Sequence, residues 1–126
     1  MNYLMDPIKN NQNNKYKVRP FIQKDMPTIS EIFTRIGWEP QYVEGQKQSI
    51  KTLTKDEAGD VLVAVSDDEV VGFIHGQHLK WNRLSYIHGL VVSPDYRRQG
   101  IAHQLISRIE QAARRHGNRG VFIDTL

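Results

Sequence analysis

The sequence contains no cysteine among its 126 residues. Without a thiol there is no disulfide, no cysteine nucleophile and no cysteine-ligated metal. Long apolar runs are also absent, since the longest purely aliphatic stretch, residues 61–65, is far shorter than the roughly 20 residues of a membrane span. The N-terminus lacks the basic and then apolar order of a secretion signal. We therefore expect a cytoplasmic protein with no membrane partner.

The chain also has only a small excess of charge of one sign, because 17 basic and 14 acidic residues leave a formal net charge of +3. That mild excess is well short of the dense basic surface of a nucleic-acid binder, so we expect no nucleic-acid partner. The composition, 39% hydrophobic and 25% charged, is typical of an ordinary globular protein. Residues 1–15 are polar and rich in asparagine, and we expect a flexible leader there, followed by one domain over residues 16–126.

The hydrophobic pattern predicts an α/β domain of the α+β kind, with a mixed, mainly antiparallel sheet flanked by helices. Strands are expected over 16–21, over 60–79 as a hairpin with an acidic turn at Asp67, Asp68 and Glu69, and over 84–93. Helical spacing predicts one helix from an Asp25 cap to Gly37 and a mostly exposed one over 41–57, with a loop at residues 38–40 between them. A strongly amphipathic helix follows Gly100 and ends at Gly117. The last strand, residues 120–126, should be buried and parallel to the strand over 84–93.

The junction before that third helix has the chemistry of an anion site. Its residues Arg97, Gln99, Gly100 and Ile101 place backbone N–H groups at a helix N-terminus, where the helix dipole is positive. Gly100 lets an oxyanion approach the main chain, and Arg97 and Arg98 add positive charge, as recognition of a pyrophosphate requires. An amphipathic helix that begins after a proline turn would contain similar residues, so the motif by itself leaves both interpretations open.

The segment LVVSPDYRRQGIA, residues 90–102, resembles the acetyl-CoA site of the GNAT superfamily of N-acetyltransferases. The signature of that family is arginine or glutamine, two residues, glycine, one residue, and then glycine or alanine. Arg97, Gly100 and Ala102 fit this signature. The strand and turn before it also match, and the order of elements from residue 16 onward is similar to the first two thirds of the family's fold.

The resemblance implies that acetyl-CoA is the cosubstrate. Its pyrophosphate would bind residues 97–102, and its pantetheine would pair with the backbone of Leu90, Val91 and Val92. The strand over 84–93 would carry a bulge and splay away from the parallel strand over 120–126. A backbone N–H near Val92 would polarise the thioester carbonyl, since a preorganised donor stabilises developing negative charge.

Acetyl transfer to an amine requires a deprotonated nucleophile, so a nearby base must accept a proton. His88 is the candidate base, because histidine titrates near neutral pH and because some family members that act on small amines have a histidine at the matching place. Tyr86, on the same face of the strand, completes the candidate catalytic pair. Ordinary half-buried strand positions are the alternative for both residues.

Trp38 and Glu39 are the candidate substrate residues. They lie in the link between the first two helices, which borders the acceptor pocket in the family that the chain resembles, and a carboxylate there would favour a cationic amine. A solvated loop is the alternative. His75 and His78 are three residues apart on a strand and face opposite sides, which makes a poor metal pair, and we predict no metal.

The resemblance therefore implies an acyl-CoA-dependent N-acetyltransferase, in which a primary amine of a small molecule or a peptide attacks the thioester directly. A catalytically silent CoA-binding or sensing module is the alternative, and a nucleic-acid binder that uses the arginine-rich helix is a third hypothesis. Compared with the family, the chain stops at Leu126, before a further helix and a pair of strands. We expect either a fragment of a longer chain or completion by a second subunit in a closely packed homodimer.

Overall fold

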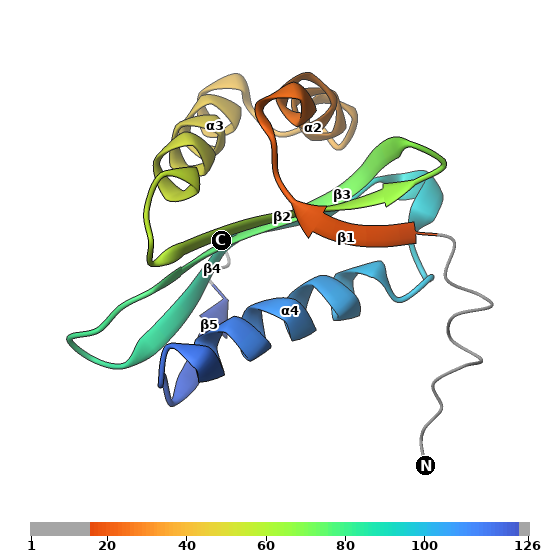
Figure 1. The fold of residues 1–126 in the computed structure, drawn as a ribbon. Coiled ribbons are helices and arrows are strands. Elements are labelled where there is room, and N and C mark those ends of the chain that lie inside the picture. The colour runs from red at the N-terminus through yellow and green to blue at the C-terminus, as the bar shows by residue number, and fades with distance from the viewer. Residues whose placement is uncertain (1–15, 124–126) are drawn as a thin grey trace, which may run out of the picture.

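The computed structural model describes residues 16–123, which form a five-stranded sheet between helices. Helices α2 (Met26–Arg35) and α3 (Pro40–Thr54) cover one face of the sheet, and α4 (Ile101–Arg115) covers the other (Figure 1). The strands are β1 (Tyr16–Pro20), β2 (Gly59–Ser66), β3 (Glu69–His78), β4 (Leu84–Val92) and β5 (Gly120–Ile123). Short 3-10 helices, η1 (Gln23–Asp25) and η2 (Pro94–Tyr96), precede α2 and α4.

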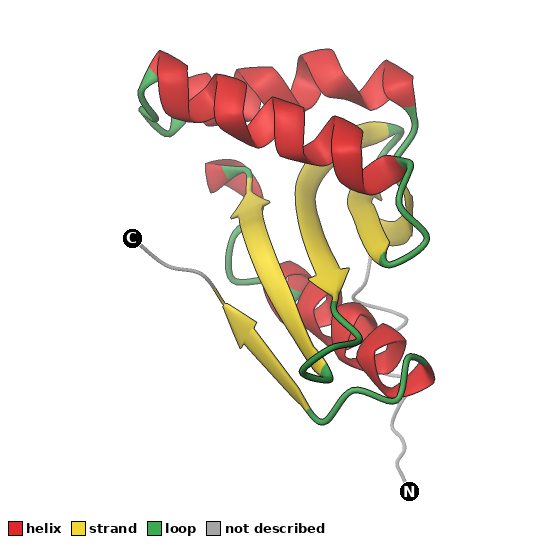
Figure 2. Ribbon diagram, turned by 90° about the vertical axis from the view of Figure 1, so that its left-hand side faces the viewer, coloured by secondary structure: helices red, strands yellow, loops and turns green. Residues whose placement is uncertain are grey.

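The described strands lie in the order β1-β2-β3-β4-β5, and neighbours are antiparallel except for β4 and β5, which are parallel. A parallel pair needs a crossover connection, and α4 provides it (Figure 2). The predicted mixed, mainly antiparallel sheet with a final parallel pair joined by a helix is therefore confirmed. Pairing of β4 with β5 ends at Ile87 and Ile123, and residues 124–126 of the predicted last strand, which would splay from the end of β4, lie outside the described range.

The alternating side chains of β2 divide between two hydrophobic layers. Val61 and Val63 pack beneath α2 and α3, whereas Leu62 and Ala64 pack against α4. The helices contribute their apolar stripes to the same layers, with Ile29, Phe33 and Ile50 on one face and Ile101, Leu105 and Ile109 on the other. Apolar residues that recur with a period of two in the strands and of 3.6 in the helices thus pack against one another in the same layers. None of the helices within residues 16–123 is long and apolar enough to cross a membrane.

The hairpin between β2 and β3 turns on Asp67 and Asp68, whose φ values of 50° and 64° both lie in the left-handed region. Two consecutive left-handed residues make a turn whose twist matches that of the paired strands, and aspartate tolerates this conformation better than most residues do. The predicted hairpin is confirmed, although Glu69 begins β3 and does not belong to the turn.

Some boundaries and one burial prediction differ from the structure. The sequence predicts a loop at Pro40, but this residue begins α3, where a missing N–H costs no helical bond. The predicted helix over 41–57 ends at Thr54. The prediction of a buried last strand is wrong, because Phe122 and Ile123 are 52% and 48% exposed. In the described sheet β5 is an edge strand with a neighbour on one side only, which leaves these side chains partly uncovered.

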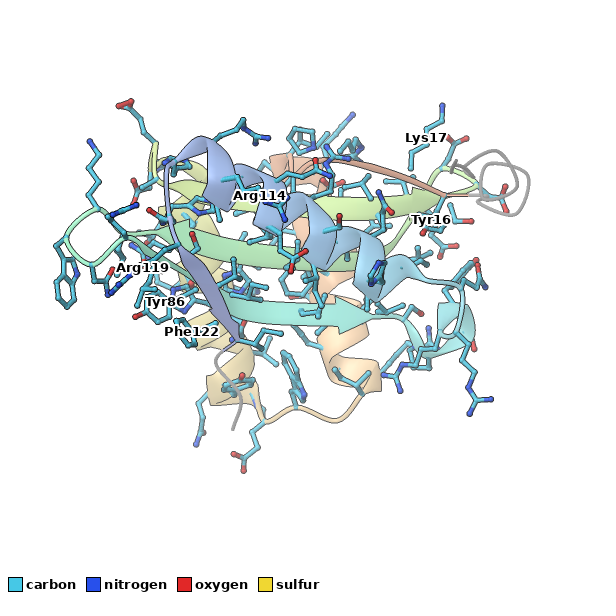
Figure 3. The ribbon with its side chains drawn as sticks, turned by 90° about the horizontal axis from the view of Figure 1, so that it is seen from below. Tyr16, Lys17, Tyr86, Arg114, Arg119 and Phe122 are labelled. Atoms are coloured by element: carbon cyan, nitrogen blue, oxygen red, sulfur yellow. The ribbon has the colours of Figure 1, made fainter. Side chains whose placement is uncertain are left out.

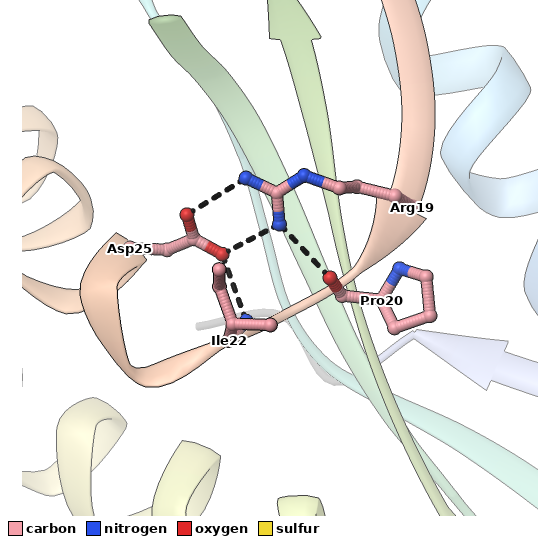
Figure 4. Close-up of polar contacts among 4 residues, drawn as sticks. All are labelled: Arg19, Pro20, Ile22 and Asp25. Atoms are coloured by element: carbon pink, nitrogen blue, oxygen red, sulfur yellow. Dashed lines mark hydrogen bonds and ion pairs between the residues drawn. The ribbon is translucent and has the colours of Figure 1, made fainter.

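The start of α2 also differs from the prediction that Asp25 caps this helix. Asp25 makes no side-chain capping bond to α2. Its carboxylate instead accepts the Ile22 backbone N–H at 2.8 Å and two nitrogens of Arg19 at 2.9 Å (Figure 4). Burial by itself would raise the pKa of Asp25, but the hydrogen bonds from Arg19 and Ile22 and the charge of Arg19 outweigh it and hold that pKa below its ordinary value. The pair therefore ties β1 to the turn before α2.

Replacing Asp25 with asparagine should lower the free energy of unfolding at neutral pH by about 1 kcal/mol, the size expected for a partly exposed charged pair. Because the folded-state pKa is lowered, the carboxylate stabilises the fold fully above its unfolded pKa of about 3.9, and this contribution is lost as pH falls through the folded pKa. Urea unfolding of both proteins over a pH series should show a difference that shrinks in acid. A difference that stays constant with pH would contradict an electrostatic role for Asp25.

Candidate functional site

The loop between β4 and α4 leads directly into the first turn of the helix. Within it Arg98 and Gly100 take left-handed conformations, with φ values of 65° and 82°. Gly100 is the N-cap residue of α4. Glycine adopts this conformation without strain, whereas a residue with a Cβ does not. The backbone conformation at the start of the helix therefore favours glycine, whatever binds there.

The N-terminus of α4 presents a row of unpaired donors. Within the described part of the chain, no acceptor takes the backbone N–H groups of residues 98–103, and the first bond into the helix runs from the Gln104 N–H to the Gly100 carbonyl at 3.0 Å. These groups lie at the positive end of the helix dipole. The first turn contains no acidic residue that would compensate this charge. The helix start is therefore suited to an anion.

A hollow of about 350 Å³ opens beside this helix start. Its wall consists of Val92, Tyr96, Arg97, Arg98, Gly100, Ile101, Ala102 and His103. Most of the predicted cofactor-binding residues thus meet around one cavity, whereas Leu90, Val91 and Gln99 are not part of its wall. Arg97 Nε donates to the Val92 carbonyl at 3.3 Å, which holds this guanidinium at the end of β4. Two arginines and a helix N-terminus therefore face the same space.

Strand β4, which ends at this hollow with Val92, carries a bulge. In the register with β3, Gly89 pairs with His75 and Ile87 pairs with Gly76, so His88 is the extra residue of β4. An extra residue on one strand kinks it and shifts the alternation of its main-chain groups. The bulge that the family resemblance implies is therefore present, and it is centred on His88.

Beyond the bulge, the direction of the β4 main chain follows from one hydrogen bond. The Ser93 N–H donates to the Val71 carbonyl of β3 at 2.7 Å. In an antiparallel ladder the main-chain groups of alternate residues face the partner strand, so those of Val91 face β3 and those of Leu90 and Val92 face away from it. The side chain of Val91 is buried in the core. Leu90 and Val92 are therefore the residues at the end of β4 whose main-chain groups point away from β3.

The candidate catalytic residues His88 and Tyr86 lie side by side on β4. Their rings are inclined by only 13°, with centroids 6.4 Å apart. His88 Nε2 is 3.2 Å from Gln77 Oε1, which can accept a hydrogen from that ring nitrogen. The ring of Tyr86 stacks on Phe122 of β5 at 5.9 Å, and its hydroxyl accepts a hydrogen bond from Asn82 at 3.3 Å (Figure 3). Both candidates are half-buried neighbours at the bulge.

The candidate substrate residues lie at the start of α3. Trp38 stacks on Phe33 with 4.7 Å between centroids and meets Tyr42 edge to face at 4.9 Å. Trp38 is therefore partly buried against the core beneath α2 and α3. Glu39 is exposed and forms the N-cap position of α3. The next turn of α3 connects this aromatic pair to the bulge, because the Tyr42 hydroxyl is 3.3 Å from Gln46 Nε2.

Sequence analysis missed a buried polar network behind the bulge. Gln46 of α3 is 8% exposed, and its Nε2 lies 3.3 Å from the His88 carbonyl oxygen. The Gln46 Oε1 lies 2.7 Å from Nε2 of His75, and the Ser49 hydroxyl lies 3.3 Å from the other nitrogen of that ring. A signal was present, since Gln46 interrupts the apolar stripe that Val43, Ile50 and Leu53 form on α3. A polar residue in such a stripe predicts a buried partner.

The protonation state of this network follows from burial. His75 has no exposed surface, and desolvation, followed by the charge of His88, lowers its pKa to about 3. The ring is therefore neutral at physiological pH. Since the His88 carbonyl can only accept, the Gln46 amide donates to it and offers Oε1 to His75, which must carry its hydrogen on Nε2. Nδ1 of His75 then accepts from the Ser49 hydroxyl, so every polar atom of the ring and the amide is satisfied.

Gly89, the residue after the bulge, lies directly against this network. A Cβ placed on Gly89 would clash with His75 Nε2 and Gln46 Oε1. Gly89 is therefore explained by the close packing of β4 against His75 and Gln46 and not by a special φ value. Because Gly89 has no side chain, β4 can lie close to the Gln46 amide.

Replacing Gly89 with alanine should lower the free energy of unfolding by about 2–4 kcal/mol, because overpacking and a broken buried hydrogen bond act together. Urea unfolding measures this loss. Gly45→Ala is the matched control, since Gly45 is exposed on α3 and no atom lies within 4 Å of the position that a Cβ would take there. Alanine at this helical position should be neutral or slightly stabilising. An unfolding free energy of Gly89→Ala equal to that of the unaltered protein would show that the network does not fill this space.

His78 contacts the opposite side of the sheet from His75, as their spacing predicts. Its Nδ1 lies 2.6 Å from the Ser85 hydroxyl and its Nε2 2.7 Å from a carboxylate oxygen of Asp60. Serine, histidine and aspartate in contact are the parts of a nucleophilic triad, but Ser85 has no exposed surface and cannot meet a substrate. The cluster is therefore structural. Within residues 16–123 no group of three His, Asp or Glu side chains is arranged to hold a metal ion.

Comparison with known proteins agrees with this geometry. Residues 25–126 match the family model for the Acetyltransferase (GNAT) family. No curated protein matches the chain significantly. A GNAT family acetyltransferase from Staphylococcus aureus has a TM-score of 0.68 and 13% sequence identity, over 90% of this chain and 88% of that one.

Two aminoglycoside acetyltransferases have similar structures. AAC(6')-Iy in complex with CoA has a TM-score of 0.71 and 18% identity, over 88% of this chain and 77% of that one. AAC(6')-Ih from Acinetobacter baumannii has a TM-score of 0.69 and 18% identity, over 88% of this chain and 80% of that one. At these identities the likeness shows a shared fold.

Proposed function

The chain belongs to the GNAT acetyltransferase family, and on this premise we propose that it transfers an acetyl group from acetyl-CoA directly to a primary amine. The observation that carries this proposal is the meeting of two features at one hollow. The unpaired N–H groups of residues 98–103 surround the start of α4, and the bulged strand β4 ends beside them.

Acetyl-CoA would bind along the end of β4 and the start of α4. The N–H groups of residues 98–103 would receive the pyrophosphate, and Arg97 and Arg98 would add charge-assisted hydrogen bonds. The main-chain groups of Leu90 and Val92 would pair with the amides of pantetheine, as an added strand pairs with a sheet edge. One of these N–H groups would then lie near the thioester carbonyl, where negative charge develops during transfer.

His88 would act as the general base, with Tyr86 beside it on the same strand. An ammonium ion has no lone pair, so the acceptor must lose a proton to attack. As the new C–N bond forms, the C–S bond breaks, the thiolate leaves, and the amine proton passes to His88 directly or through a water molecule. Direct transfer suits this chain, because it has no cysteine and Ser85 is buried.

The acceptor that we propose is a cationic amine. Glu39 offers an exposed carboxylate at the start of α3, and the neighbouring Trp38 offers an aromatic surface that can contact a cation. Two of the similar structures are aminoglycoside acetyltransferases, which makes a polycationic small molecule the first acceptor to try. A peptide amine is the other acceptor class.

Calorimetric titration of acetyl-CoA into the purified protein tests the first step, and release of free CoA thiol in the presence of an amine panel tests the second. Saturable binding at one site per chain with turnover is the expected result. Binding without turnover by any amine would instead favour a CoA-binding or sensing module. A folded sample that binds no acetyl-CoA would refute the proposal, and steeply salt-dependent binding to DNA or RNA would favour a nucleic-acid binder.

A further inference from the structure

The buried network touches the β4 bulge at one main-chain atom, the carbonyl oxygen of His88. A bulge takes an extra residue out of the regular ladder, so its main-chain groups need partners from elsewhere. Gln46 of α3 supplies one, with Nε2 at 3.3 Å from this oxygen. A helix side chain therefore contributes to the support of the bulge.

Gln46 is itself held on several sides. Its Nε2 meets the Tyr42 hydroxyl at 3.3 Å, and its Oε1 meets His75 Nε2 at 2.7 Å. His75 in turn stacks on Phe73, with ring planes inclined by 10° and centroids 5.6 Å apart. Gly89 closes the remaining side, because any side chain there would clash with the amide. With so many contacts on a buried side chain, the amide has one orientation.

The position of the bulge decides which N–H groups face a ligand. The N–H groups of successive strand residues point in alternating directions. If the extra residue of the bulge moves along β4, each residue between its old and its new position changes register by one, and its N–H group points the opposite way. With the bulge at His88, the N–H groups of Leu90 and Val92 point away from β3 and that of Val91 points toward it. A bulge displaced toward the end of β4 would turn Leu90 or Val92 toward β3.

We propose that Gln46 is a positioning residue for acetyl transfer, which holds the bulge at His88 and thereby aims the main-chain groups of Leu90 and Val92 at the bound acetyl-CoA. This role rests on the function proposed above. Gln46 does not touch the reacting atoms and acts only through the main chain of β4. The proposed pyrophosphate contacts on α4 are separate from this network, and only the pantetheine contacts of Leu90 and Val92 depend on it, so the role concerns turnover more than cosubstrate affinity.

Gln46→Glu tests the proposal, because it preserves the size of the side chain and replaces its N–H donors with an acceptor. The turnover number should fall about 10- to 100-fold, as expected for misplaced transition-state contacts. The dissociation constant for CoA should rise by less than about fivefold, under the 1.4 kcal/mol of a tenfold change, because the pyrophosphate contacts on α4 remain and only the pairing with pantetheine is disturbed. Gln48→Glu is the matched control, since Gln48 is exposed on the same helix and makes the same change of charge.

Amide hydrogen exchange gives a readout that does not depend on activity. In the unaltered protein the Val91 N–H should be protected and those of Leu90 and Val92 should exchange faster. Gln46→Glu should weaken this contrast while the melting temperature shows a folded protein. Gln46→Met, which has similar volume and no strong donor, serves the same test if the glutamate variant does not fold.

The outcomes separate this inference from the proposed function. Full turnover or an unchanged exchange pattern in a folded Gln46 variant would overturn the positioning role alone. Loss of turnover together with an equal loss of CoA affinity would also overturn it, because that result indicates general disruption. If the unaltered protein binds acetyl-CoA but acetylates no amine, the proposed function fails, and with it the role of Gln46 in transfer.

Discussion

Replacing Gly100 with glutamine is expected to weaken acetyl-CoA binding by at least about 100-fold, because several charge-assisted hydrogen bonds of roughly 1.5–3 kcal/mol each would be lost. The new side chain would project at the start of α4, where phosphate oxygens must approach the main chain. The described residues leave room for it, since among those beyond its chain neighbours only the Tyr16 hydroxyl comes within 4 Å of a Cβ at Gly100, at 3.9 Å. Figure 3 shows Tyr16 of β1 at the end of the molecule where α4 begins. Calorimetric titration measures the effect directly.

Gly117→Gln is the matched control for the strain that the substitution introduces. Gly117 has a φ of 76°, close to the 82° of Gly100, and apart from its chain neighbours no residue in 16–123 has an atom within 4 Å of its Cβ position. It follows the opposite end of α4, far along the helix from the anion site. Both variants should therefore lose about 1 kcal/mol of stability, the cost of a left-handed residue with a side chain. Only Gly100→Gln should lose acetyl-CoA affinity, and normal binding by that variant would refute the pyrophosphate site.

Replacing His88 with alanine is expected to lower the turnover number about 100-fold or more, the usual range for loss of a general base. Acetyl-CoA affinity should stay the same, because the contacts of the proposed cosubstrate site lie on the main chain of β4 and on α4. The bulge should survive, since Gln46 binds the His88 carbonyl and not its ring. The pH profile of kcat/KM should lose the limb that reports deprotonation of the enzyme's base and keep the limb of the substrate amine.

Two further variants sharpen the test of His88. His88→Gln retains a hydrogen-bonding group beside Gln77 but no base, so it should be as slow as the alanine variant. His116→Ala removes an exposed histidine beyond the C-terminal end of α4 and should turn over normally. If His88→Ala kept the original pH profile and rate, His88 would be an ordinary strand residue and a bound water chain would have to accept the proton.

Local patterns in the sequence were enough to predict most of the fold. The strands and helices follow from hydrophobic periodicity, and the β2–β3 hairpin follows from Asp67 and Asp68, because these signals act between residues a few positions apart. The proposed pyrophosphate site could be predicted for the same reason. Its N–H groups, its glycine and its arginines all belong to the continuous segment 90–102, so their proximity depends only on the local conformation of the chain.

The tertiary structure decided what lies around that segment. Behind the bulge, three residues that are far apart in the chain come into contact: Gln46 of α3, His75 of β3 and Gly89 of β4. Asp25, which the sequence predicts to be a helix cap, forms an ion pair with Arg19 instead. A polar residue in an apolar stripe indicates that a buried partner exists, but the choice among distant partners depends on how whole elements pack. The exposure of Phe122 has the same origin, because burial of a strand depends on its neighbours in the sheet and not on its own apolar residues.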